Sequence, residues 1–460
     1  MQMKASGSPD PVADPATVGL PPAGEHGRGA RWRRILRTVG HFSLGYGALQ
    51  AINVVVGLFL VRALSIEAYA QFGLATGFQI TASNLMDLGF ASTVIPLVGD
   101  RFNDRTVVGT YVQAARRLRT RAFLILAPFT TVAFVAIAWK HHWSWTLQVL
   151  LILPVLLALY SSGNVSCCSA PFFLQRRLRE YYAPQTLSGL VRLVMYVILR
   201  IVGGLNAWTA TALSALNITY IGAAFARKCR SWTDWTQRDT HATQREIVHY
   251  VLPALPALIF GALQAQISLF LISIFGQTTG IAQVAALNRI AQVFLVLQAF
   301  NVAIVEPYIA RLRRERVLLV YLGLIVLVSV CFVPVVLLSF TFPGAILCLL
   351  GSKYEGLGDV VGWLVLASCI NYVATLAWIM NRARKWIFWS GTILEIVLVL
   401  AVQIGFLIVV GVRTTREAVM FTLASSCCLV AAHAYNAVYG FLRGPRVLPG
   451  GQALDDATAG

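Results

Sequence analysis

Charged residues are scarce in this chain, and acidic residues are the scarcest. Only 12% of the 460 residues are charged, and 19 acidic residues stand against 37 lysines and arginines. A soluble domain has roughly 25% charged residues, so the composition excludes an ordinary water-soluble fold. Hydrophobic residues instead make up 57% of the chain, which is typical of a protein embedded in a membrane.

The cysteine patterns of metal sites and disulfide frameworks are also missing. The chain has eight cysteines, but no CxxC pair and no His/Cys spacing of a zinc site. Paired carboxylates and glycine-rich phosphate loops do not occur either. We therefore predict no cofactor, no bound metal and no catalytic residue.

Apolar stretches of about 20 residues recur along most of the chain, which is the length needed to cross about 30 Å of hydrocarbon. They predict an all-α membrane protein with about twelve transmembrane helices. The first six spans are expected at 42–63, 69–98, 122–139, 147–172, 184–203 and 207–226, and the second six at 250–275, 282–305, 317–342, 360–381, 386–412 and 416–442.

Basic residues concentrate in the segments that join alternate spans, as in "RRLR" at 176–179 and "RLRRER" at 311–316. Lysine and arginine accumulate in cytoplasmic loops, so the placement of these residues predicts that both termini lie in the cytoplasm. The net charge of +18 is explained by this topology and does not indicate a nucleic-acid partner. The predicted division is a basic N-terminus at 1–41, a lobe at 42–226, a cytoplasmic linker at 227–249, a lobe at 250–442 and a tail at 443–460.

The two halves of the chain resemble each other weakly. Ala70-Gln71 near the start of the second span matches Ala282-Gln283 near the start of the eighth. The first and seventh spans both carry amides in mid-helix. Six spans per half keep the halves in the same orientation, which predicts two six-helix lobes related by a pseudo-two-fold axis normal to the membrane.

Three motifs resemble a known family. "RALSIEAYAQFGL" at 62–74, "MDLGFASTVIPLV" at 86–98 and "FPGAILCLLGSKYEG" at 342–356 are similar to polysaccharide flippases of the multidrug/oligosaccharidyl-lipid/polysaccharide exporter superfamily. Ala70 stands where that family usually has glycine. The resemblance implies a flippase in the bacterial cytoplasmic membrane that moves undecaprenyl-diphosphate-linked oligosaccharides between leaflets. Its implied partners are this lipid-linked oligosaccharide, membrane lipids and polysaccharide polymerase machinery.

Polar residues inside the spans are candidates for contacting such a substrate. A polar stripe facing lipid would be costly, so it should face a cavity or another helix. Interhelical hydrogen bonding alone would explain the amides equally well. The predicted substrate-binding residues are Gln50, Asn53, Gln79, Arg192, Asn288, Arg289 and Gln292.

The two arginines of "VRLVMYVILR" sit at different depths in their span. Arg192 is so near the middle of the span that extending its side chain to the interface would cost free energy. It should therefore pair with a buried acid or meet an anion in a polar cavity. Arginine suits a diphosphate because its planar fork makes bidentate, charge-assisted hydrogen bonds. Arg200 lies near the end of the span and can extend to the outer interface.

Two acidic residues are candidates for ion coupling or gating. Asp87 lies near the cytoplasmic end of its span, where pairing with a basic residue is the alternative. Glu395 is expected near the middle of the eleventh span and could bind and release H⁺ or Na⁺, or pair structurally with an arginine or with His433 of the twelfth.

Other functions remain open on the sequence alone. A multidrug/cation antiporter of the same superfamily would favour carboxylates in its cavity over arginines. A lipid II flippase usually has an Arg-Asp pair in the first span, where this chain has Gln50 and Asn53. An integral-membrane polymerase or glycosyltransferase would need external carboxylates, and few are expected there.

Overall fold

The computed structural model describes residues 28–175, 177–235, 240–310 and 312–443. The chain divides into two units, Met1–Leu44 and Gly45–Gly460, and the second contains both groups of helices that form the bundle. Every element of secondary structure within the described residues is a helix. The predicted N-terminus at 1–41 lies outside them as far as residue 27, and the predicted tail at 443–460 lies outside them from residue 444.

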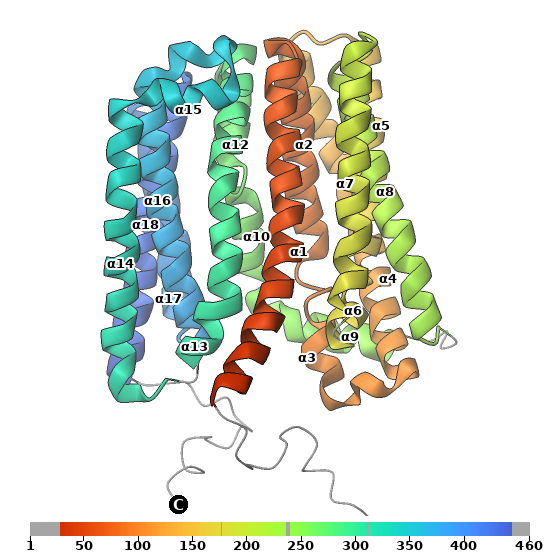
Figure 1. Cartoon of the computed structure of the whole chain (residues 1–460). Coiled ribbons are helices and arrows are strands. Elements are labelled where there is room, and N and C mark those ends of the chain that lie inside the picture. The colour runs from red at the N-terminus through yellow and green to blue at the C-terminus, as the bar shows by residue number, and fades with distance from the viewer. Residues whose placement is uncertain (1–27, 176, 236–239, 311, 444–460) are drawn as a thin grey trace, which may run out of the picture. The chain divides into compact units, whose positions relative to one another are not determined.

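Six long helices form the first lobe (Figure 1). Two short helices, α3 (Val94–Val98) and α6 (Ala170–Leu174), lie between them in sequence. The long helices are α1 (Arg28–Ala63), α2 (Ile66–Asp87), α4 (Arg105–Lys140), α5 (Trp145–Cys167), α7 (Leu178–Ile201) and α8 (Ala207–Trp232).

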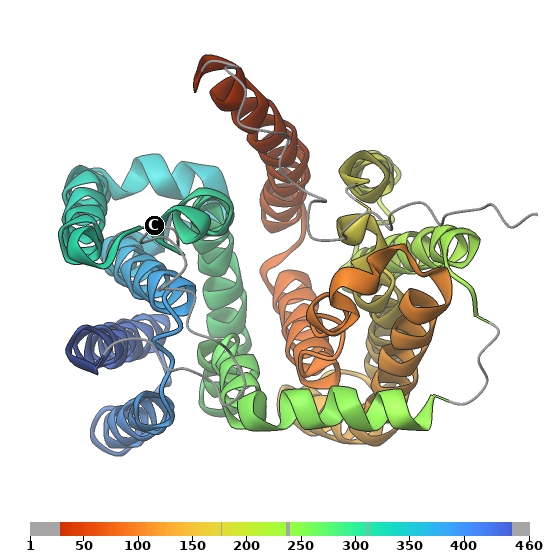
Figure 2. The same ribbon diagram turned by 90° about the horizontal axis from the view of Figure 1, so that it is seen from below.

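A linking helix, α9 (His241–Val251), leads into the second lobe (Figure 2). The short helices here are α13 (Glu306–Ala310) and α15 (Pro343–Leu350). The longer segments are α10 (Leu255–Gln264), α11 (Ile267–Phe275), α12 (Thr278–Phe300), α14 (Arg314–Thr341), α16 (Gly358–Ala383), α17 (Trp389–Val409) and α18 (Thr415–Arg443).

Each expected span has a helical counterpart, but several ends differ. The second span is shorter than the predicted 69–98, because Leu88 and Gly89 take positive φ angles of 40° and 80° and end α2 at Asp87. The fifth begins at Leu178 and not at Pro184, which lies inside α7. Polar residues extend α7 before its apolar stretch, so hydropathy alone misplaces the start of that helix.

The seventh span is interrupted where we expected one continuous helix. Ala265 and Gln266 separate α10 from α11, and the φ and ψ of Gln266 are −129° and 14°. Broken helices at membrane depth are tolerated where neighbouring protein satisfies the freed backbone groups.

Nine of the described helices are long and apolar enough to cross a membrane, and α9 with α10 forms a tenth candidate with a 71° bend. The helix α2 is not among them. It is buried along most of its length inside the protein, so it needs no apolar surface toward lipid. The chain is a multi-pass membrane protein.

Helix packing repeats between the two lobes. In the first, α5 packs on α8, α2 and α4, and α7 packs on α8. In the second, α16 packs likewise on α18, α12 and α14, and α17 packs on α18. The prediction of an all-α membrane fold with two six-helix lobes is confirmed.

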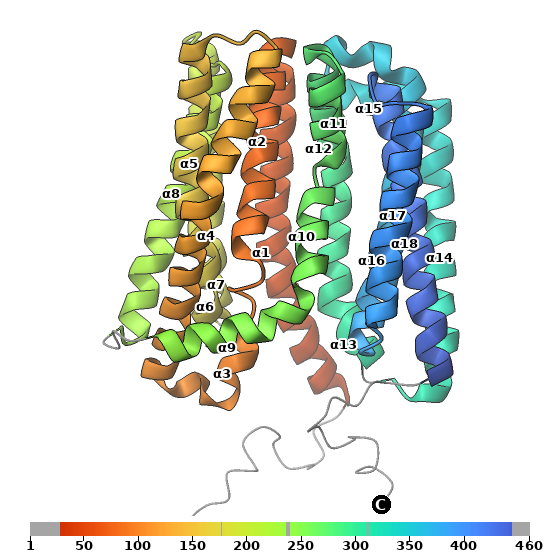
Figure 3. The same ribbon diagram turned by 180° about the vertical axis from the view of Figure 1, so that it is seen from behind.

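The lobes contact each other along α2 and α12, which lie side by side in Figures 1 and 3. The Tyr69 hydroxyl donates to the Ala285 carbonyl over 3.4 Å. A Cβ atom at Gly73 would lie only 2.7 Å from Cβ of Ala285, so glycine permits this close approach. The contact brings side chains of both lobes into one site.

Candidate functional site

Arg289 lies at the middle of α12, where the two lobes meet. Its Nε donates to the Tyr69 hydroxyl of α2 over 3.1 Å, and its Nη1 donates to Gln292 Oε1 over 3.4 Å. The guanidinium carbon lies 6.0 Å from the Phe72 ring centroid. A Cβ atom at Gly57 of α1 would lie 3.0 Å from Cδ of Arg289, so that glycine leaves the arginine its space.

Arg192 lies on the facing side of the first lobe. Its Nη2 donates to Asn53 Oδ1 of α1 over 2.9 Å, while its buried Nε has no hydrogen-bond partner within the described residues. Nine residues separate it from Ile201 at the end of α7, or about 14 Å at 1.5 Å per residue. Arg200 is exposed in the last helical turn, and an anchoring role at the interface remains a prediction.

The two arginines come from opposite lobes but lie at a similar depth. Arg289 follows Thr278, the first residue of α12, by eleven residues, or about 17 Å along the helix. Both arginines lie against α1 within about one helical turn, Arg192 at Asn53 and Arg289 at Gly57.

Neutral groups accept the hydrogen bonds that these two guanidinium groups donate to Asn53, Tyr69 and Gln292. Neither arginine forms an ion pair with a carboxylate in the described part of the chain. We call Arg192, Arg289, Asn53, Tyr69 and Gln292 the two-arginine site. It presents two positive charges without a compensating acid.

The remaining predicted binding residues lie on the same helices but do not all join this site. Gln50 donates to the Tyr46 hydroxyl of its own helix over 2.8 Å. Gln79 and Asn288 are half-buried and form no hydrogen bond with either arginine within the described residues. Their role as substrate contacts remains a prediction.

Asp87 has the structural partner that we named as its alternative role. Its Oδ1 lies 3.3 Å from Nη1 of Arg119 on α4, whose side chain is only 4% exposed. Arg119 also donates to Ser83 Oγ over 3.0 Å and to Ser162 Oγ over 2.7 Å. This network joins α2, α4 and α5 inside the first lobe.

Glu395 lies near His433, as the sequence suggested. The distance from Glu395 Oε2 to His433 Nδ1 is 4.0 Å, and the side chains are 26% and 7% exposed. Asn381 Nδ2 donates to the His433 carbonyl over 2.9 Å, and its Oδ1 accepts from the Tyr321 hydroxyl over 3.2 Å. Glu395 is the seventh residue of α17, so it lies nearer the start of that helix than we predicted.

Sequence reasoning missed a polar cluster beside the break between α10 and α11. Gln264 and Gln403 exchange two amide hydrogen bonds of 2.9 and 2.7 Å, and Gln403 also donates to Ser425 Oγ over 2.9 Å. Gln403, a polar residue within the apolar second half of its span, was the available signal. The cluster joins α10, α17 and α18 within the second lobe.

On the side predicted to be external, polar side chains of one lobe bind backbone carbonyls of the other. Arg62 Nε donates to the Leu349 carbonyl over 3.0 Å, and Lys353 Nζ donates to the Leu64 carbonyl over 2.7 Å. Lys140 donates to the Ile274 carbonyl, and His141 Nε2 lies 2.8 Å from the Ser273 carbonyl oxygen. We call these four contacts the inter-lobe latch.

No protein-family model and no curated protein matches the chain. Several solved structures match it in fold. A multidrug-resistance MATE transporter of the MOP superfamily, in an inward-facing conformation, is 15% identical; the match covers 86% of this chain and 94% of that one, with a TM-score of 0.61.

The lipid II flippase MurJ, in an inward closed conformation, is 12% identical; the match covers 87% of this chain and 89% of that one, with a TM-score of 0.56. A MOP-superfamily transporter from Pyrococcus furiosus, described by a reversed polarity of its binding pocket, is 14% identical; the match covers 89% and 95%, with a TM-score of 0.52. The chain has the fold of these MOP-superfamily transporters.

Proposed function

We propose that this protein is a flippase that moves undecaprenyl-diphosphate-linked oligosaccharides across the bacterial cytoplasmic membrane. The observation that carries the proposal is the two-arginine site, with Arg192 from one lobe and Arg289 from the other. The diphosphate would bind between them, and the fold supplies two lobes that can rock around it.

The energetics favour an anionic ligand at this site. An arginine at mid-membrane depth costs about 2.5–3.5 kcal/mol on insertion scales, and two like charges raise that cost. A diphosphate that enters the membrane also loses its hydration. Pairing it with the arginines offsets the desolvation cost of both groups. Neutral partners such as Asn53 and Tyr69 orient the guanidinium groups and leave their charge available.

A multidrug/cation antiporter is the second candidate, because a MATE transporter shares the fold. The charge of the site argues against it, since a cation would meet two arginines without a carboxylate beside them. The lipid II flippase MurJ also shares the fold. Its likeness supports a lipid-linked substrate but does not identify the glycan.

An enzyme is the candidate from another class. Within the described residues, no group of three or more His, Cys, Asp or Glu side chains could hold a metal. Glu417, one of the few acids expected outside, accepts hydrogen bonds from the backbone amides of Arg413 and Thr414 over 2.6 and 3.0 Å. That carboxylate supports the start of α18, so it is a poor candidate for acid–base chemistry.

Transport in reconstituted vesicles tests the proposal. Purified protein would be placed in liposomes with a fluorescent undecaprenyl-diphosphate oligosaccharide, and a membrane-impermeant quencher would report the fraction in the outer leaflet. We expect flipping by the native protein and its loss in Arg192→Ala, Arg289→Ala. Arg200→Ala, which removes an exposed arginine of the same helix, is the control. Full flipping by the double variant would overturn the proposal.

A further inference from the structure

Helix α9 crosses α4 at one end of the first lobe (Figure 3). Two adjoining hollows lie beside these helices. One encloses about 560 Å³ and is lined by Arg121, Arg245, Gln244 and Val248, among others. The other has a volume of about 510 Å³ and is lined by Arg116, Arg117, Arg230 and Trp235, among others, with Arg121 shared between the two. We call four of these arginines, Arg116, Arg121, Arg230 and Arg245, with Gln244 and Trp235, the α4–α9 arginine pocket.

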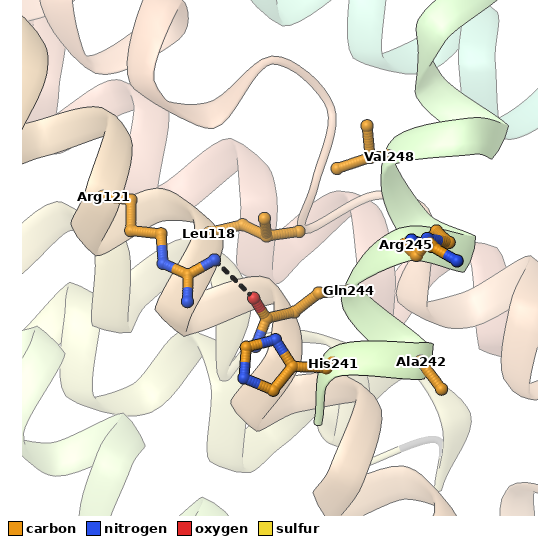
Figure 4. A pocket seen from close by; sticks show the side chains of 7 residues that line it. All are labelled: Leu118, Arg121, His241, Ala242, Gln244, Arg245 and Val248. Carbon is orange, nitrogen blue, oxygen red and sulfur yellow. Dashed lines mark hydrogen bonds between the residues drawn. The ribbon is translucent and has the colours of Figure 1, made fainter. Parts of the chain in front are cut away.

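Arg121 of this pocket is held in place by a neutral group. Arg121 Nη1 donates to Gln244 Oε1 over 2.8 Å, and the buried Gln244 donates in turn to Thr240 Oγ1 over 2.7 Å. Figure 4 shows Arg121 and Arg245 on opposite sides of the hollow, with Gln244 between them. Fixed guanidinium groups lose little further entropy when they bind a ligand.

An aromatic ring holds the other two arginines. The guanidinium carbons of Arg116 and Arg230 lie 5.6 and 4.9 Å from the Trp235 ring centroid. None of the four arginines forms an ion pair with a carboxylate among the residues that the structure describes. The acid of α9, Glu246, accepts a 2.7 Å hydrogen bond from the Tyr111 hydroxyl.

The part of α9 beside the pocket exposes apolar side chains, as helices at a membrane interface do. The chain bends by 71° between α9 and α10, so α9 lies across the bundle while α10 runs along it (Figure 3). Ile247 and Val251 are buried, whereas Val248 and Tyr250 are 38% and 53% exposed. A helix with exposed apolar residues beside arginines belongs at the depth of lipid headgroups.

We propose that the α4–α9 arginine pocket binds the phosphate of an anionic lipid in the adjoining leaflet. Basic pockets at the ends of membrane helices on the cytoplasmic side bind anionic headgroups, and arginine binds phosphate through paired N–H donors. The phosphate can belong to a phospholipid headgroup or to the diphosphate of a polyprenyl lipid. The phospholipid case is independent of the proposed transport function.

Lipid binding to the full-length protein tests this inference. Detergent-solubilised protein would be titrated with phosphatidylglycerol, with undecaprenyl diphosphate and with phosphatidylcholine, and bound lipid counted by native mass spectrometry. We expect both anionic lipids, or one of them, to bind at least about tenfold more tightly than phosphatidylcholine, since the arginines form charge-assisted hydrogen bonds to phosphate.

The variant Arg121→Gln, Arg245→Gln should lose this preference, while Arg121→Lys, Arg245→Lys, which keeps the charge but not the paired donors, should retain only part of it. The control Arg179→Gln, Arg416→Gln removes the same charge from exposed positions outside the pocket and should bind normally. If phosphatidylglycerol binds more tightly, the pocket is a phospholipid site. If undecaprenyl diphosphate binds more tightly, the pocket is a site for the polyprenyl lipid. Unchanged binding in the glutamine variant, or equal binding of all three lipids, would overturn the inference.

Discussion

Asn53 and Arg192 are joined by a 2.9 Å hydrogen bond from Nη2 to Oδ1 that links α1 to α7. The amide orients the guanidinium without neutralising it. Replacing Asn53 by Asp puts a carboxylate of nearly the same shape at that position. The resulting ion pair would keep the helices together but cancel the charge that we assign to diphosphate binding.

We therefore expect Asn53→Asp to reduce flipping at least about tenfold, because a charge-assisted contact of about 1.5–3 kcal/mol must be broken before the substrate binds. The vesicle assay measures this, at matched reconstitution levels. Gln50→Glu introduces the same charge one turn away, where the side chain meets Tyr46, and should have the smaller effect. Equal losses in both variants would contradict the role given to Arg192.

The pair formed by Asp87 and Arg119 should matter for stability and not for ion coupling. Asp87→Asn leaves the guanidinium of a nearly buried arginine without its counter-charge. We expect a loss of about 2 kcal/mol in stability, below the value for a fully buried pair because the Asp87 side chain is partly exposed. Thermal unfolding of the purified protein would show a lower Tm. Loss of transport at unchanged Tm would instead return Asp87 to the coupling candidates.

Glu395 is the better candidate for coupling, since it lies near His433 and is partly exposed. If it carries H⁺ or Na⁺, Glu395→Gln should fold normally, slow transport and weaken its response to an imposed pH or Na⁺ gradient. Initial rates in vesicles with and without each gradient provide the measurement. If the variant responds to both gradients as the native protein does, Glu395 has a structural role only.

Close packing of α2 on α12 should tolerate no added methyl group. A Cβ atom at Gly73 would lie 2.7 Å from Cβ of Ala285, so Gly73→Ala must push the helices apart. Overpacking of this kind costs about 1–3 kcal/mol, and Tm should fall. Gly47→Ala is the matched control, because a Cβ atom added there would meet no atom within 4 Å. A Tm equal to that of the control would show that the lobes can separate freely here.

The orientation in the membrane can be tested by labelling. Cysteine introduced at the exposed position Glu355 should react with a membrane-impermeant maleimide from outside intact cells, because the basic bias places it there. Cysteine at Arg313, also exposed, should react only after permeabilisation. The native Cys331, Cys348 and Cys427 are exposed and must first be replaced. Reaction of the Arg313 variant in intact cells would reverse the proposed topology.

The fold was largely predictable because membrane spans depend on long apolar runs, which a sequence displays directly. The break at Gln266 was not, since no proline or glycine marks it and the neighbouring Gln264 finds its partner, Gln403, on a helix far along the chain. Similarly, depth along a helix identified Arg192 and Arg289, but only the folded chain shows that Asn53 and Tyr69 are their partners. The α4–α9 arginine pocket could not be predicted, because it depends on where the linking helix α9 lies. The hydropathy of that helix is too low to place it from the sequence.

The inter-lobe latch has a consequence for how such a protein changes over evolutionary time. Its acceptors are backbone carbonyls of Leu349, Leu64, Ile274 and Ser273. A substitution leaves the main-chain carbonyl in place, so the side chains at those positions can change without removing the acceptors of the latch. Selection on the latch then acts mainly on the donors Arg62, Lys353, Lys140 and His141, because only these groups are lost when the side chain changes.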